Sequence, residues 1–254
     1  MNLKHLTFAA LIALLFSSCV SVYSPALYHQ DIAYQPKPAS FDTVKSASYV
    51  SAGFNNYLNS DQDLMQSGQF NLSRGHAFKN TNLAYGAFGV FGDLENSSIQ
   101  QGKPYYFTDK FFGAVGGRAS FNFFVNSGRT DFRFLGIEAA YSHEFGDYLD
   151  FRRTVNGKSG IIADTRSDLV TIGLTTEILF HNWGNTHIQH GLRGFLGTTF
   201  GNNDLEYGTD NFEPDNSKLF RQFFPKVSYF INFNKFFCTA EAGQQFFVRF
   251  GIKF

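Results

Sequence analysis

The sequence predicts an all-β protein in which ten antiparallel strands, joined as an up-and-down meander, close into a transmembrane β-barrel. Two observations lead to this fold class: apolar and polar residues alternate along the expected strands, and short connections alternate with long ones. Eight strands are the alternative count, because residues 46–57 and 69–78 carry the weakest strand patterns. No amphipathic helix is expected from residue 46 onward.

The last ten residues, 245–254, carry the clearest alternation. One face of this stretch would hold Phe246, Val248, Phe250, Ile252 and Phe254, and the other Phe247, Arg249, Gly251 and Lys253. Ten residues match the roughly 9–11 that a tilted strand needs to cross a bilayer. The alternative is an edge strand of a soluble sandwich, but such a strand rarely places five bulky apolar residues on one face.

The other strands are expected in sequence order at residues 46–57, 69–78, 81–92, 110–125, 131–145, 168–180, 187–200, 219–232 and 235–243. The connections around residues 126–130, 181–186 and 232–235 are short, whereas residues 93–109, 146–167 and 201–218 form long polar ones. An even number of strands places both ends of the barrel domain, residues 45–254, on the side of the short turns.

The N-terminal residues read as an export signal followed by a linker. Lys4 and His5 precede an apolar run that ends at Phe16, and residues 1–18 form the expected signal peptide. Residues 15–19, LFSSC, resemble the lipobox of bacterial lipoproteins, which implies acylation of Cys19. An ordinary cleaved signal is the alternative, because Phe16 stands where a smaller aliphatic residue is usual.

Residues 19–44 are proline-containing and show no period, so we expect a lipid-anchored periplasmic tether in solvent. The alternative is that Tyr23, Tyr28 and Tyr34 fold back into the mouth of the barrel as a plug.

The end of the chain resembles the C-terminal assembly signal of Gram-negative outer-membrane barrel proteins. Phe250, Ile252 and Phe254 match the terminal aromatic residue and the apolar residues at every second position before it. The resemblance implies an outer-membrane location with both termini in the periplasm. It also implies outer-membrane lipid and the barrel assembly machinery as partners.

The strand faces opposite the apolar ones carry a balanced set of charges. These inward positions are Arg118, Glu138, Glu177, Arg193, Lys226, Glu241 and Arg249. Three carboxylates and four cations in a narrow lumen favour a paired network that fills the barrel, because an unpaired charge there is costly. The alternative is that the same residues select ions or small solutes in a narrow channel.

The sequence offers no catalytic motif, metal site or cofactor site. His143 next to Glu144, and the aspartates of residues 146–167, are better explained as a polar rim than as a hydrolase site. The acidic stretch 201–218 lacks the spacing of an EF-hand. The formal net charge of zero argues against nucleic acid as a partner.

These patterns predict a non-enzymatic outer-membrane lipoprotein with a plugged lumen. It would serve envelope structure or bind an unidentified protein partner through its outer loops or its tether. A narrow small-solute channel is the first alternative, and a hydrolase of lipid or peptide acting at the rim is the second.

Overall fold

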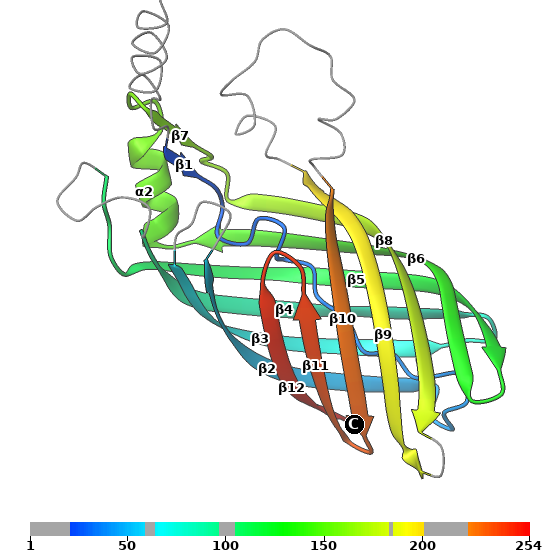
Figure 1. Cartoon of the computed structure of the whole chain (residues 1–254). Helices are drawn as coiled ribbons and strands as arrows, with labels where there is room; N and C mark the ends of the chain where they lie inside the picture. Colours follow the sequence, from blue (N-terminus) through cyan, green and yellow to red (C-terminus); the bar gives the residue numbers. More distant parts are fainter. Residues whose placement is uncertain (1–20, 59–63, 97–104, 183–184, 201–222) are drawn as a thin grey trace, which may run out of the picture.

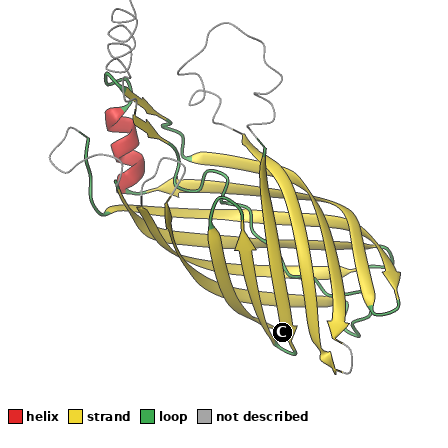
Figure 2. Ribbon diagram, in the orientation of Figure 1, coloured by secondary structure: helices red, strands yellow, loops and turns green. Residues whose placement is uncertain are grey.

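A closed barrel of ten antiparallel strands dominates the computed structural model, which describes residues 21–58, 64–96, 105–182, 185–200 and 223–254 (Figures 1 and 2). The barrel strands are β2 (Ser46–Leu58), β3 (Leu64–Ala77), β4 (Thr81–Glu95), β5 (Lys110–Ser127), β6 (Thr130–Phe145), β8 (Asp168–Asn182), β9 (Asn185–Phe200), β10 (Phe224–Phe233), β11 (Phe236–Ala242) and β12 (Phe246–Lys253). The predicted meander of ten strands is confirmed, and the alternative of eight is wrong.

The barrel closes where its last strand meets its first. Strand β12 pairs with β2 in antiparallel register, with Val248 opposite Phe54 and Ile252 opposite Val50. Each of the ten strands therefore has a neighbour on both sides. Closure removes the free edges that would otherwise leave backbone N–H and C=O groups without partners in a membrane.

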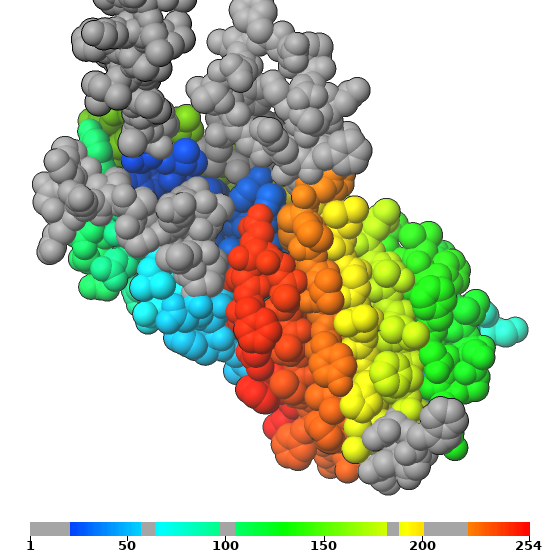
Figure 3. All heavy atoms as spheres, viewed as in Figure 1, coloured from blue at the N-terminus to red at the C-terminus, as the bar shows by residue number. Residues whose placement is uncertain are grey.

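The outer face of the wall is apolar, as the alternation predicts. Large hydrophobic side chains are exposed on every barrel strand, among them Phe54, Phe70, Phe91, Phe121, Ile137, Leu174, Leu196, Val227, Phe236 and Phe250. The space-filling view shows one side of this wall, where successive strands form adjacent bands (Figure 3). The inward positions carry polar and charged residues together with buried hydrophobic ones such as Phe230 and Phe237.

One irregularity of the wall changes which residues face inward. The pairing of β6 with β8 shifts between Arg133 and Gly136, so Phe134 and Leu135 are both exposed in succession. A bulge of this kind reverses the in-and-out alternation on its far side. Arg133 consequently points into the barrel, although simple alternation from Ile137 would have turned it outward.

A small lid covers the end of the barrel that carries the long connections. It consists of helix α2 (Asp147–Val155) and a parallel pair of short strands, β1 (Ser21–Tyr23) and β7 (Ile161–Ala163). The expectation of no helix was therefore wrong for residues 146–167. The buried side chains of α2 are Tyr148, Leu149, Arg152 and Val155, which follow a helical period. No helix in the described ranges is both long and apolar enough to span a membrane.

Residues 24–42, hereafter the plug, run through the inside of the barrel. Most of their side chains are buried, including Ile32, Tyr34 and Lys37. The chain leaves the lumen at the short-turn end, where the amide of Ala77 donates to the carbonyl of Lys45 at 2.7 Å. The expectation of a solvated segment was wrong for these residues. The alternative placed a plug in the mouth of the barrel only, whereas the segment runs the length of the lumen.

The two ends of the described chain lie at opposite ends of the barrel. Ser21 belongs to the lid, whereas Phe254 exchanges backbone hydrogen bonds with Ser48 at the short-turn end (Figure 1). From the sequence, both ends of the mature chain were expected on the same side. The difference arises because the plug crosses the barrel before β2 begins.

Candidate functional site: the plugged lumen

An ion cluster inside the barrel joins the plug to the wall. The Lys37 ammonium lies 2.7 Å from Oε1 of Glu177, and both side chains are fully buried. Oε2 of the same carboxylate accepts from Nη1 of Arg133 at 2.6 Å. Lys37 also donates to Ser120 Oγ and Asn122 Oδ1, each at 2.8 Å. All three of its protons thus have acceptors.

Wall cations bind the backbone carbonyl groups of the plug. The donors are Arg118 to Asp31, Lys226 to Ile32 at 2.7 Å, Arg249 to Tyr34 at 2.8 Å and Arg133 to Pro38 at 3.0 Å. The plug has almost no regular secondary structure of its own, so its buried backbone groups require such partners. Each charged side chain here stabilises a specific path of the plug.

Wall carboxylates bind backbone amides of the plug in the same way. Glu144 accepts from the amide of Ala26 at 2.7 Å, Glu241 from Tyr34 at 3.0 Å and Asp131 from Ser40 at 2.6 Å. The Asp31 side chain points the other way, accepting from Thr171 Oγ1 at 2.6 Å. The Tyr34 ring also stacks on Phe230 with 4.3 Å between centroids.

A second charge network links strands of the wall. Arg193 donates to both carboxylate oxygens of Glu138, and its Nη1 lies 4.0 Å from Oε2 of Glu241. Arg249 pairs with the other oxygen of Glu241. Bidentate guanidinium–carboxylate pairs of this kind are among the strongest polar contacts in proteins.

The structure places all seven predicted lumen charges inside the barrel, but it divides them among three roles. Glu138, Arg193, Glu241 and Arg249 form the wall network described above, and Glu177 lies in the ion cluster with Lys37. Arg118 and Lys226 were expected to pair with carboxylates. They donate instead to carbonyl groups of the plug, at Asp31 and Ile32.

Sequence reasoning missed as many buried charges as it found. Across the described residues, seven buried cations balance seven buried carboxylates; the additional members are Asp31, Lys37, Asp131, Arg133, Glu144, Arg152 and Asp164. Asp31 and Lys37 were missed because the plug was read as a solvated linker. Arg133 was missed because the bulge reverses its direction, and an irregular apolar pair at Phe134 and Leu135 was the available signal.

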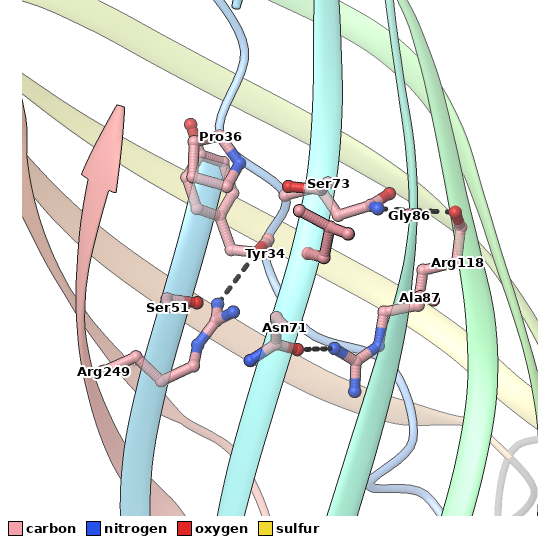
Figure 4. Close-up of a pocket in the computed structure, with 11 residues that line it drawn as sticks. Tyr34, Pro36, Ser51, Asn71, Ser73, Gly86, Ala87, Arg118 and Arg249 are labelled. Carbon is pink, nitrogen blue, oxygen red and sulfur yellow. Dashed lines mark hydrogen bonds between the residues drawn. The ribbon is translucent and has the colours of Figure 1, made fainter. Parts of the chain in front are cut away.

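The packed side chains leave little free space beside the plug. A void of about 10 Å³ lies between the plug and β2–β5, next to Arg118 and Arg249 (Figure 4). A void needs roughly 10–15 Å³ to hold one water molecule. Beside the plug at this level, the described residues therefore leave room for about one water molecule.

A hydrophobic cluster packs the lid against the barrel. It joins the lid to the upper wall through Tyr23, Leu27, Met65, Phe88, Leu94, Phe107, Phe112, Tyr148, Val155 and Leu169. Tyr148 donates its hydroxyl proton to the carbonyl of Ser24 at 3.0 Å. Arg152 of α2 pairs with Glu144 at 2.6 Å, with both side chains buried. The lid and the start of the plug therefore pack as one unit.

The polar rim contains a His–Asp pair on the outer surface. His143 Nδ1 lies 3.0 Å from Oδ1 of Asp168, and Tyr141 donates to the same oxygen at 2.5 Å. The hydroxyl of Ser167 donates to Asp168 rather than to the imidazole. The histidine therefore has an orienting carboxylate, but the serine beside it is not activated by the ring.

Two of the predicted assembly-signal residues, Phe250 and Ile252, lie on the outer face of β12, and Phe254 directly follows the strand. Phe250, Ile252 and Phe254 are all exposed, with the interior positions between them occupied by Gly251 and Lys253. Cys19 and the acidic stretch 201–218 fall outside the described residues. In the described part of the chain, no group of three or more His, Cys, Asp or Glu side chains could hold a metal ion.

No family model matches the sequence, and no curated protein matches it. Among solved structures, the chain is similar to a bacterial polysaccharide outer membrane secretin at 8% identity and a TM-score of 0.32, over 84% of this chain and 99% of that one. CdiB from Acinetobacter baumannii gives 8% and 0.28, over 82% and 59% of the two chains. The TodX monoaromatic hydrocarbon channel deltaS2 mutant gives 7% and 0.29, over 82% and 65%. Identities and TM-scores this low support no transfer of function from these proteins. The description of a plugged ten-stranded barrel therefore rests on the structure of this chain alone.

Proposed function

We propose that this chain is a non-enzymatic outer-membrane lipoprotein with a plugged lumen, which serves envelope structure or binds a partner through its exposed loops. The observation that carries the proposal is the plug itself. Buried cations and carboxylates of the wall bind its backbone along the length of the lumen. Opening a solute path requires separating pairs such as Lys37–Glu177. Leaving a buried charge unpaired costs about 3–5 kcal/mol, so such opening is rare.

Two features support the membrane location. The apolar outer face would be unfavourable in water over an area as large as this wall, whereas hydrocarbon accommodates it. The closed barrel satisfies its backbone without solvent, which is the condition for spanning a bilayer with strands. The signal-like residues 1–18 and the terminal Phe254 favour the outer membrane in particular.

A narrow channel is the second candidate, and the polar lining of the lumen favours it. Single-channel recording of the purified, refolded chain separates the two functions. We expect no steady conductance from the full chain, and steady conductance from a variant in which Cys19 is joined directly to Thr43. Circular dichroism and heat-dependent gel migration of the variant establish that its barrel is intact.

The outcome that would overturn the plugged function is steady conductance from the full chain. A silent full chain together with a conducting shortened chain supports it. If both chains are silent while both barrels are folded, the wall side chains alone close the lumen, and the plug then has no sealing role.

The His143–Asp168 pair is the observation that favours a rim hydrolase. We nevertheless propose that the chain is not an enzyme, because the neighbouring Ser167 does not reach the imidazole. The test compares the wild type with His143→Ala on phospholipid and peptide substrates. Hydrolysis that disappears in the variant would establish the enzyme.

A further inference from the structure

We propose that the N-terminal segment crosses the membrane inside the barrel, so that the chain before Ser21 emerges at the lid, on the opposite side from Phe254. A lipid on Cys19 would then insert into the leaflet at the lid end. This inference rests on the proposed membrane location. It departs from the expectation that a periplasmic anchor holds the N-terminus beside the C-terminus.

The first step is that the chain is fixed at the lid. Strand β1 pairs with β7 from Ser21 opposite Ile161 to Tyr23 opposite Ala163. The Ser21 amide donates to the carbonyl of Gly160 at 3.0 Å, and the carbonyl of Tyr23 accepts from Asp164 at 2.9 Å. These hydrogen bonds fix both the first and the last residue of β1 to the lid.

The second step is that the plug runs in one direction along a single wall strand. On β6, Ala26 contacts Glu144 and Asp31 contacts Ser142. Further along the plug, Pro38 contacts Arg133 and Ser40 contacts Asp131. As the residue number along the plug rises, the residue number of its contact on β6 falls. The plug therefore runs in one direction from the lid to the short turns.

The third step is the distance covered. The contacts on β6 extend from Glu144 to Asp131. At about 3.3 Å per residue this part of the strand is roughly 43 Å long, or roughly 33 Å along the axis for a tilt of about 40°. The hydrocarbon core of a bilayer is about 30 Å thick. The plug therefore spans a full membrane thickness within the wall.

The fourth step is the exit. Lys253 lies 3.5 Å from the Asp42 carboxylate, which places the end of the plug beside the C-terminal strand. At the other end, two peptide units separate Cys19 from Ser21, a reach of at most about 7 Å. That reach is short compared with the barrel, so an acyl group on Cys19 belongs to the lid end.

Cysteine labelling on intact cells tests this topology. All variants carry Cys238→Ala, and the chain with this substitution alone is the blank. Ser21→Cys reports the N-terminal segment, Lys158→Cys reports the lid end, and Arg129→Cys reports the short-turn end, since Lys158 and Arg129 are both exposed. The probe is a membrane-impermeant maleimide, applied before and after permeabilisation of the outer membrane.

We expect Ser21→Cys to label together with Lys158→Cys, several-fold above the blank, under the condition in which Arg129→Cys stays unlabelled. Labelling of Ser21→Cys together with Arg129→Cys would overturn the proposal. If Ser21→Cys does not fold, an epitope inserted between Val20 and Ser21 is scored against the same two references by antibody binding.

The result separates this inference from the proposed function. The path of the plug through the membrane is tested by whether Ser21→Cys labels like Lys158→Cys or like Arg129→Cys. The outward direction of the long loops is tested separately, by which of these two reference variants labels on intact cells. Mass spectrometry of the mature N-terminus tests acylation independently. A chain without a lipid on Cys19 would end the lipoprotein assignment and leave the threading intact.

Discussion

The Lys37 ammonium of the plug and the Glu177 carboxylate of β8 lie 2.7 Å apart inside the barrel, and neither side chain is accessible to solvent. The two residues are 140 positions apart in the sequence. Their contact joins a segment that precedes the barrel to one of the wall strands. The stability of the plug should therefore depend on this pair.

Replacing Lys37 by Met should destabilise the folded chain by about 1–3 kcal/mol. The loss is below that of a wholly unpaired charge because Arg133 still pairs with Glu177. Urea unfolding in detergent micelles, followed by circular dichroism, measures the change. Lys79→Met is the control, since Lys79 is exposed in the turn after β3. Equal stability of the two variants would contradict the role assigned to the pair.

The close approach of the plug to β3 gives a second prediction. A Cβ atom on Gly75 would lie 2.9 Å from the carbonyl oxygen of Pro36 and 3.0 Å from Cα of Lys37, whereas one on Gly68 of the same strand meets nothing within 4 Å. Gly75→Val should therefore cost about 1–3 kcal/mol through overpacking. Gly68→Val gains the same β-propensity without the clash.

The same urea measurement compares these two glycine variants. Protease sensitivity of the plug should also rise in Gly75→Val, because the clash displaces residues 36–38. Equal behaviour of the two variants would mean that the plug does not pack against β3 at this position.

The terminal aromatic residues can be separated from ordinary wall residues by a matched pair. Phe250 and Phe236 are almost equally exposed, at 66% and 64%, but only Phe250 belongs to the predicted assembly signal. Phe250→Ser should lower the folded fraction in the outer membrane several-fold more than Phe236→Ser. The measurement is heat-dependent gel migration of membrane fractions. Equal losses would show that this position acts only through its apolar surface.

Much of the wall was predictable because strand alternation depends on neighbours in the sequence. Outward residues such as Ile137 and Leu174 are apolar, and inward ones such as Glu138 and Glu177 are polar, so the pattern itself assigns the faces. The bulge in β6 broke this local rule. Simple alternation therefore gave the wrong direction for Arg133, one of the partners of Glu177.

The plug could not be predicted in the same way, because its conformation is set by distant partners. Its backbone groups bind side chains such as Glu144 and Glu241, which lie 118 and 207 positions away. No local period records such contacts. The lid helix was missed for a different reason: its polar residues made 146–167 read as a loop, although its buried positions follow a helical spacing.

The membrane-facing wall gives a prediction that a soluble barrel would fail. Leu174 lies near the middle of β8, and its side chain is 55% exposed on the outer face. Leu174→Lys should cost about 2–4 kcal/mol in a bilayer, because a charge there enters hydrocarbon. Asn156→Lys, at the exposed end of α2, should change little. Unfolding in lipid vesicles measures the stability of both variants. Unchanged stability in Leu174→Lys would contradict the membrane location.

The lid contains two adjacent arginines in contrasting environments, which makes a direct test of its docking. Arg152 is buried and pairs with Glu144 at 2.6 Å, whereas Arg153 is exposed and lies 3.7 Å from Asp150. Arg152→Leu should release the lid at a cost of about 3–5 kcal/mol, since Glu144 loses its cation. Arg153→Leu should cost at most about 1 kcal/mol.

Hydrogen exchange read out by mass spectrometry distinguishes release of the lid from unfolding of the barrel. In Arg152→Leu, amides of α2 and β1 should exchange faster while those of β5 and β8 stay protected. Arg153→Leu should match the wild type throughout. Uniform loss of protection in Arg152→Leu would mean that the lid and the wall unfold together. In that case the contact between Arg152 and Glu144 holds the whole barrel and not the lid alone.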